Sequence, residues 1–390
     1  MRLSSDIFDR AHSYVEHCRR HYSRQPWRAS LSFAWWGMLH SFCRTRTDSG
    51  LHGEELRVAL VLDGGMGDVL FHIRYIKDLC AQCGPFSLDV YTPLSPCIIQ
   101  KLLDGAVHVR AVRKGKVKEA YDLIIYSLLM PMTVFFDARR VEKLASPALK
   151  AYVAALESFK ADNPQWFKQQ EYFMADILNY ARILEKKRAE FPYMLGSIRP
   201  QAEECVDMSL SAMDFPWGER PFITVSRGAG GDADSTKLWP EEKYDTLMCL
   251  IRERFPKAVF VQTGKAGEAK LEADCDMRGK TTLDELTALM ARADLHISSE
   301  GGTVHLRHLL RGGPSVVLFG PTDPAFYGYP ENCDLRAAEC LPCEWAQREW
   351  QKQCVRGFDQ CRAMEALQPD FVFKEMLEHP QIREALCRML

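Results

Sequence analysis

The stretch from Asp294 to Pro324, DLHISSEGGTVHLRHLLRGGPSVVLFGPTDP, decides how the rest of the chain is interpreted. It predicts a strand, a tight turn at Gly301 and Gly302, a helix and a second strand, because adjacent glycines permit a close backbone approach that side chains would prevent. In open α/β sheets ligands bind at the carboxyl ends of the strands, and a helix that begins there offers unpaired N–H groups to an anion. The stretch therefore predicts either a phosphate-binding turn or a simple connection, and the glycines alone favour neither.

Composition places the chain among globular proteins of two or three domains. It has 390 residues, 47% of them hydrophobic, and a net charge of −2, so it lacks the strong positive field expected of a nucleic-acid-binding protein. No stretch near the start has the apolar core of a secretory signal. The longest apolar run, residues 123–136, is too short to span a membrane and contains Pro131. Because the fourteen cysteines are scattered, we expect a reducing cytoplasm.

A second strand, turn and helix are predicted early in the chain. The run LRVALVL at residues 56–62 predicts a buried strand, and DGGMGD at residues 63–68 leads into the helical pattern VLFHIRYIKDLC. Asp68 occupies the position of a helix N-cap, so it either satisfies the N–H groups at the helix start or serves as a general base at the rim of a cleft. Further strands are predicted at residues 86–91, 106–112 and 121–126. Their alternation with helices predicts a doubly wound, mostly parallel sheet.

The second half of the chain repeats this alternation. A helical region is predicted over residues 139–195, and Pro192 and Pro200 mark a linker after it. Strands at residues 221–226 and 258–263 then alternate with helices and lead to Asp294. We therefore divide the chain into a helical extension, two Rossmann-like domains, and a C-terminal cysteine-containing segment, at residues 1–52, 53–200, 201–330 and 331–390.

The loop SRGAGGDADSTKLWP, residues 226–240, is richer in glycine and small polar residues than a connection requires. Its backbone N–H groups are suited to cradle a phosphate, and Lys237 is suited to supply a positive charge to a departing diphosphate. The alternative is a flexible surface loop with a solvated lysine. The loop sequence alone favours neither.

Residues 1–52 combine helical periodicity with an aromatic cluster, from Trp27 to Phe42, and with arginines on both sides of it. This composition suits an amphipathic helix at an anionic membrane surface. It also suits a helix that packs on the domain or on another subunit. We favour packing, because tryptophan and phenylalanine are more often buried against protein than against lipid.

Four cysteines after the second domain form the clearest metal signal. Cys340 and Cys343 make a C-x2-C pair, and Cys354 and Cys361 follow. Four thiolates complete a tetrahedral site for zinc or iron. A closed site of this kind leaves no position for a substrate water, so we expect a structural role and no catalytic metal. The alternative is a set of reduced cysteines in a loop.

Several motifs occur together and in one order along the chain. They are GGMGDVL, STKLWPEEKY, VFVQTG, SSEGGTVHL and VVLFGPTDP. In this combination the chain resembles glycosyltransferase family 9, the ADP-heptose transferases of bacterial surface glycans, over residues 56–378. The resemblance implies an α/β fold of the GT-B type, with two facing Rossmann-like domains, to which this chain adds the N-terminal helical extension and the C-terminal cysteine finger.

The resemblance also implies roles for individual residues. Asp68 is the expected catalytic base, and Lys237 is the expected partner of the donor diphosphate. Glu300 and Gly301 stand where the family has aspartate and threonine, so one hydroxyl contact to the donor is missing. The expected acceptor-side loop is Gly65, Met66 and Gly67. The expected donor-binding residues are Ser226, Arg227, Gly228, Lys237, Thr263, Gly264, Glu300, Gly301, Gly302, Thr303 and His305.

The implied reaction is an inverting transfer of heptose from ADP-heptose to a hydroxyl of a surface glycan such as the lipopolysaccharide core. A comparable cysteine cluster occurs in protein heptosyltransferases that modify autotransporters, so a serine of a surface protein is the alternative acceptor. A nucleotide-sugar-binding protein without turnover is a third alternative, which Asp68 and Lys237 disfavour. We expect the protein in the cytoplasm. The N-terminal extension would make either a contact with the inner face of the membrane or a contact between copies of the chain.

Overall fold

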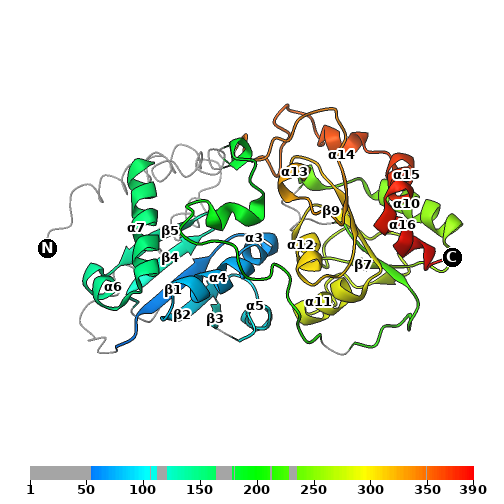
Figure 1. The fold of residues 1–390 in the computed structure, drawn as a ribbon. Coiled ribbons are helices and arrows are strands. Elements are labelled where there is room, and N and C mark those ends of the chain that lie inside the picture. Colours follow the sequence, from blue (N-terminus) through cyan, green and yellow to red (C-terminus); the bar gives the residue numbers. More distant parts are fainter. Residues whose placement is uncertain are drawn as a thin grey trace.

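The computed structural model describes residues 54–390, with the exception of 106, 112–120, 164–177, 180, 211–212, 228–234 and 348. The predicted N-terminal extension, residues 1–52, lies outside the described residues. Two α/β domains lie side by side, each built on its own sheet with helices packed against it (Figure 1).

The first sheet has five strands in the order β3-β2-β1-β4-β5. All neighbours are parallel except β4 and β5. The predicted strand at residues 56–62 forms β1, which is buried from Val58 to Leu62, because a central parallel strand is covered on both faces. The strands are β1 Arg57–Leu62, β2 Ser87–Thr92, β3 His108–Ala111, β4 Leu123–Ser127 and β5 Pro131–Phe136. The helices around this sheet are α3 Met66–Leu70, α4 Ile73–Cys83, α5 Pro96–Leu102, α6 Ala138–Leu144 and α7 Pro147–Asp162, followed by the 3-10 helix η1 Arg188–Tyr193.

The second sheet has six parallel strands in the order β11-β10-β9-β6-β7-β8. Renumbered within this half of the chain, the order is that of the Rossmann fold. The strands are β6 Phe222–Ser226, β7 Val259–Thr263, β8 Cys275–Asp276, β9 Leu295–Ser299, β10 Ser315–Leu318 and β11 Cys333–Leu335. The helices are η2 Ser235–Lys237, α10 Glu241–Arg254, α11 Leu283–Arg292, α12 Gly302–Leu309, α13 Pro324–Tyr327, α14 Arg362–Ala366, α15 Pro369–Glu378 and α16 Pro380–Cys387.

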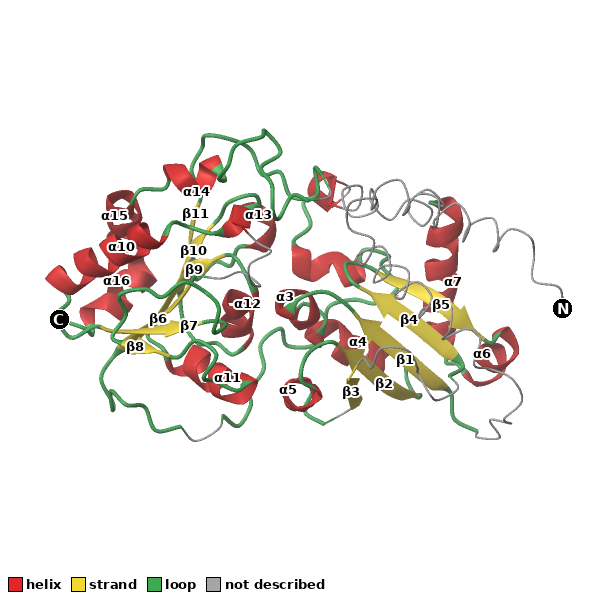
Figure 2. Cartoon of the chain, turned by 180° about the vertical axis from the view of Figure 1, so that it is seen from behind, coloured by secondary structure: helices red, strands yellow, loops and turns green. Residues whose placement is uncertain are grey.

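The C-terminal helices belong to the core of the second sheet. Val372 of α15 and Ile382 of α16 are fully buried in the same apolar cluster as Ile297 of β9 and Val316 of β10. Figure 2 shows α15 and α16 beside α10, on one side of this sheet. The end of the chain thus packs against the domain that begins with β6.

Two features of the first domain correct the sequence predictions. Asp68 is the third residue of α3 and not its N-cap, which is Gly65; its carboxylate still serves the helix start, because Oδ2 accepts from the N–H of Gly65. The predicted helical region at residues 139–195 is interrupted between α6 and α7. Ser146 caps α7 by accepting from the N–H of Leu149, and Pro147 follows as its first residue.

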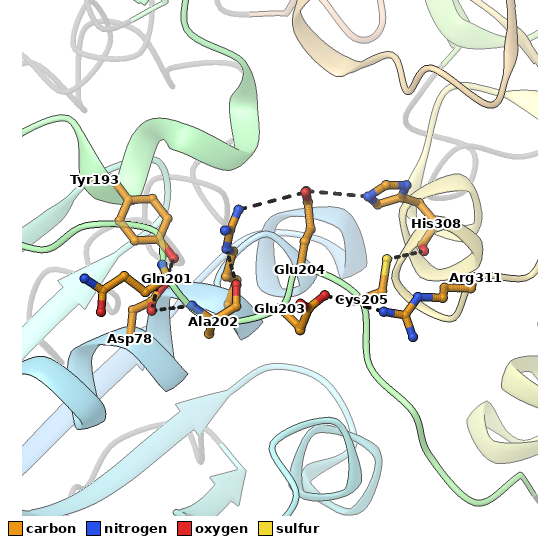
Figure 3. A network of polar contacts seen from close by, with 10 residues as sticks. Asp78, Tyr193, Gln201, Ala202, Glu203, Glu204, Cys205, His308 and Arg311 are labelled. Carbon is orange, nitrogen blue, oxygen red and sulfur yellow. Dashed lines mark hydrogen bonds and ion pairs between the residues drawn. The ribbon is translucent and has the colours of Figure 1, made fainter.

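The segment between the two sheets is tied to both domains (Figure 3). On the first domain, the carboxylate of Asp78 in α4 accepts from the backbone N–H groups of Gln201 and Ala202, at 3.1 and 2.8 Å. On the second domain, Glu204 Oε1 lies 3.5 Å from Nε2 of His308 in α12, an ion-pair distance. Residues 201–204 of the connection therefore contact helix α4 of one domain and helix α12 of the other.

Candidate active site

The site lies where α3 of the first domain meets α12 of the second. Helix α3 follows β1 and helix α12 follows β9. In each sheet the strand order reverses next to that strand, between β1 and β4 and between β6 and β9, and open α/β sheets bind ligands at such a point. A Cβ on Gly67 would lie 2.7 Å from Cδ2 of His305, and a Cβ on Gly302 would lie 2.7 Å from Cε of Met66. Only glycine permits this approach. We call this contact of Met66 and Gly67 with Gly302 and His305 the seam.

Asp68 lies on the first-domain side of the seam, with its side chain 34% exposed. Its Oδ1 is 3.0 Å from Nη2 of Arg188. Its backbone carbonyl accepts from Nδ1 of His72 at 2.7 Å, and Nε2 of His72 lies 2.7 Å from the hydroxyl of Ser127. Burial, reinforced by Arg188, lowers the pKa of His72 to about 3, so the ring is neutral and Ser127 donates to Nε2. A fixed, half-exposed carboxylate of this kind can accept a proton from a bound hydroxyl.

Glu300 lies on the other side of the seam and is buried. Its Oε2 is 2.8 Å from Nζ of Lys237, and its Oε1 accepts from Nε2 of His305 at 3.2 Å. Burial alone would raise the pKa of Glu300, but Lys237 and His305 outweigh it and hold the pKa below the usual carboxyl range. Nδ1 of His305 lies 3.0 Å from the hydroxyl of Tyr329, within hydrogen-bond distance. Lys237 also lies 5.6 Å from the ring centre of Trp350, so its ammonium is fixed by an anion and an aromatic face.

The other predicted donor residues lie at the carboxyl edge of the second sheet. Ser226, the last residue of β6, pairs in register with Thr263 of β7. Gly264 follows with φ of 146°, and a Cβ there would overlap the carboxylate of Glu268. Arg227 forms an ion pair with Glu241 at 3.2 Å. Gly228 lies outside the described residues. The hydroxyl of Thr303, which follows Gly301 and Gly302 in the chain, lies 3.1 Å from Nε2 of the buried His296.

Three residues of the site carry no sequence motif that could have marked them. Arg188 is 120 positions from its partner Asp68. Glu344 has a fully buried side chain 3.2 Å from Nη2 of Arg182, and burial together with the charge of Glu300 raises its pKa to about 8. Trp350 lies beside Lys237, and its carbonyl accepts from the hydroxyl of Thr236. Glu344 and Trp350 both come from the cysteine-containing loop, which therefore reaches the second-domain side of the seam.

The four predicted metal ligands line one cavity of about 300 Å³, together with Trp350 and Arg362. Burial is the largest cause that raises the pKa of Cys343 to about 11, and the other three cysteines contribute to the rise. Arg336 contacts the sulfur of Cys340 at 3.8 Å. In the described part of the chain, no three His, Cys, Asp or Glu side chains are arranged to hold a metal ion as they stand.

Two facing Rossmann-like domains, with a half-exposed carboxylate on one side of the seam and a lysine on the other, define a glycosyltransferase of the GT-B type. The model of glycosyltransferase family 9 (heptosyltransferase) matches residues 126–357, and the chain belongs to this family.

Three proteins that this chain is similar to share between 14% and 23% of its sequence. Lipooligosaccharide heptosyltransferase 2 of Haemophilus influenzae is 23% identical over 302 residues, which are 70% of this chain and 85% of the relative. The structure of E. coli ADP-heptose LPS heptosyltransferase II covers 85% of this chain and 99% of its own, with a TM-score of 0.50 and 14% identity. The iron-containing dodecameric glycosyltransferase TibC of enterotoxigenic E. coli covers 87% and 79%, with a TM-score of 0.55 and 14% identity. At such identities the structures show a shared fold.

None of the helices in the described residues is long and apolar enough to cross a membrane.

Proposed function

We propose that this glycosyltransferase moves heptose from ADP-heptose to an acceptor hydroxyl, with inversion at the anomeric carbon and with Asp68 as the base. The observation that carries the proposal is the pair of charges at the seam: a half-exposed carboxylate on the first domain, and Lys237 held by Glu300 on the second. Membership of the heptosyltransferase family supports the sugar class.

In the proposed reaction the acceptor oxygen attacks the anomeric carbon while Asp68 takes its proton. ADP leaves from the opposite face, and Lys237 stabilises the charge that develops on the departing diphosphate. General-base help is worth about 10²–10⁴-fold in rate. The N-terminal end of α12, which begins at Gly302, offers further N–H groups to the diphosphate.

We propose a bacterial surface glycan such as the lipopolysaccharide core as the acceptor. The named relative from Haemophilus influenzae is a lipooligosaccharide heptosyltransferase, which supports this choice. A serine of a surface protein is the second candidate. The four-thiol cavity favours it, because TibC, which shares the fold, is iron-containing, and because the resemblance to protein heptosyltransferases that modify autotransporters rests on these same cysteines.

The test is a donor and acceptor panel with the purified full chain. ADP-heptose and ADP-glucose are each supplied with lipopolysaccharide core acceptors or with autotransporter passenger protein, and products are read by mass spectrometry. We expect a mass increase of one heptose on one acceptor class, with ADP released only when that acceptor is present. Tight binding of ADP-heptose without transfer to any acceptor would favour the binding protein, and use of ADP-glucose alone would overturn the donor.

We propose that Cys340, Cys343, Cys354 and Cys361 bind one structural zinc or iron. All four thiols line the same cavity, and four thiolates are a ligand set for zinc or iron. Metal analysis of the full chain should give about one equivalent of zinc or iron. Cys343→Ser should lose it, whereas Cys249→Ser, at an exposed cysteine of α10, should keep it. A metal-free wild-type protein would overturn the site.

We propose that the extension at residues 1–52 provides the contact with another copy of the chain, in a cytoplasmic enzyme. One structural relative, TibC, is dodecameric. Light scattering of the full chain and of a chain lacking residues 1–52 tests this: the truncation should lower the mass of the assembly. If the mass is unchanged and the full chain alone binds vesicles with anionic lipid, the extension is a membrane contact instead.

A further inference from the structure

A buried arginine touches the proposed base. Arg188 begins η1, and its side chain is fully buried. Its Nη2 donates to Oδ1 of Asp68 at 3.0 Å and to the carbonyl of Leu128 at 2.6 Å. Because Oδ2 of Asp68 accepts from the N–H of Gly65 at 3.0 Å, both oxygens of the carboxylate are held in place.

The guanidinium of Arg188 lies between two aromatic rings, 4.8 Å from the centre of Phe71 and 5.6 Å from that of Phe191. Phe71 packs against His305 with ring centroids 4.4 Å apart, and Phe191 packs against Phe326 at 4.8 Å. His305 and Phe326 belong to the second domain. The contact between the domains therefore covers Arg188, and the exclusion of water strengthens its pairing with Asp68.

A purely structural role explains this arginine poorly. Its Nε and Nη1 have no hydrogen-bond partner among the described residues, and leaving N–H groups of a buried cation unpaired costs stability. Apolar side chains of similar volume are often as stabilising or more so in such a position. An apolar side chain cannot, however, bind Oδ1 of Asp68.

We propose that Arg188 is a positioning residue, which fixes the orientation of the Asp68 carboxylate while Asp68 remains exposed enough to take a proton. This inference rests on the proposed role of Asp68 as the base. A base acts only within hydrogen-bond reach of the proton it removes, and a displacement of about 1 Å costs about 10²-fold in rate. Arg188 therefore contributes to turnover through Asp68.

The experiment compares two substitutions in the full chain. Arg188→Met removes the hydrogen bonds and keeps most of the volume, so kcat should fall about 10²-fold while ADP affinity and the KM for the donor stay near wild type. Arg188→Lys keeps a donor within reach of Asp68 without the planar fork, so its kcat should lie between those of Arg188→Met and wild type, again with KM and ADP affinity near wild type.

Arg140→Met is the matched control. Arg140 and Asp122 form another arginine–aspartate pair of the first domain, with Nε and Oδ1 2.6 Å apart and Asp122 fully buried, at the opposite end of β4. Both methionine variants are expected to lower the melting temperature. Only the Arg188 variant should lower kcat by about 10²-fold with KM near wild type, since only that pair includes the proposed base.

The failures can be told apart. Wild-type turnover in Asp68→Asn overturns the proposed base itself. An inactive Asp68→Asn combined with a wild-type kcat in Arg188→Met overturns the positioning role alone. In the Asp68→Asn background, Arg188→Met should add little further loss, because the two residues act as a unit; a full additional loss overturns the inference. If Arg188→Met does not fold, Arg188→Lys decides, and a wild-type kcat in that variant overturns the positioning role.

Discussion

Asp68 and Glu300 are two carboxylates near the N-terminus of a helix that follows a strand, Asp68 in the first turn of α3 and Glu300 just before α12. Asp68 is 34% exposed and has one cationic partner, Arg188. Glu300 is 5% exposed and has two partners, Lys237 and His305. Burial with two partners makes Glu300 a permanent charge that can hold a lysine. Exposure with one partner leaves Asp68 able to exchange a proton. Neighbours from other elements thus set different chemistry on the same local fold.

The largest expected effect of breaking this comparison is at Asp68. Asp68→Asn keeps the size and polarity of the side chain but cannot take a proton, so kcat should fall by about 10²–10⁴-fold. Calorimetry should show ADP affinity close to wild type, because Lys237 and α12 are unchanged. Asp63→Asn is the control: this neighbouring carboxylate is already held by the hydroxyl of Tyr126 at 2.8 Å and by the N–H of Gly64, and its loss should leave most turnover.

An intermediate effect is expected at Glu300 and Lys237. Lys237→Met should weaken ADP binding by roughly 10–10²-fold, the range for a lost charge-assisted hydrogen bond to phosphate. Glu300→Asp is the sharper test, because a side chain shorter by one methylene cannot reach Lys237 and His305 together. We expect it to weaken ADP binding, measured by calorimetry, by less than Lys237→Met does. Unchanged affinity in both variants would contradict a donor role for this pair.

The smallest expected effect concerns the connection between the domains. Burial lowers the pKa of His308, but the carboxylates of Glu204 and Glu331 outweigh it and raise the pKa from 6.5 to about 9. The stabilisation of the folded chain by protonated His308 is therefore fully present below pH 6.5 and is lost as the pH rises through about 9. His308→Gln should lower the melting temperature at pH 6 by a few degrees and flatten its fall between pH 6.5 and 9. His108→Gln, at a histidine whose side chain is 80% exposed, should leave the pH dependence in place.

The fold was predictable where the sequence carries long apolar runs. β1, β2, β4 and β9 were expected from such runs, and the GT-B arrangement from the order of the motifs. β5 was not expected, because residues 131–136 include Pro131 and pair as an antiparallel edge strand through a contact that only the tertiary fold supplies. Ser146 and Pro147 are typical of a helix start and indicate the break between α6 and α7, but the helical pattern on both sides predicts one continuous region.

The site was predictable where a motif exists. Asp68, Lys237, Glu300 and His305 all came from motifs, and the structure brings each to its side of the seam. Arg188 and Glu344 could not have been found, because their roles depend on contacts across more than a hundred residues of sequence, with Asp68 and with Arg182. Trp350 could not have been found either, because only the cysteines of its loop form a motif. The roles of these residues depend on tertiary contacts, which no local sequence pattern indicates.

The two glycines of the seam make the spacing between the domains adjustable by a single methyl group. Gly67 and Gly302 belong to different domains, and a Cβ on either would overlap the opposite helix. Alanine at either position would push the two helices apart without replacing any charged side chain of the site. A pair of alanine variants would thus hold the enzyme in an opened form, in which the cost of separating acceptor and donor could be measured without altering the reacting residues.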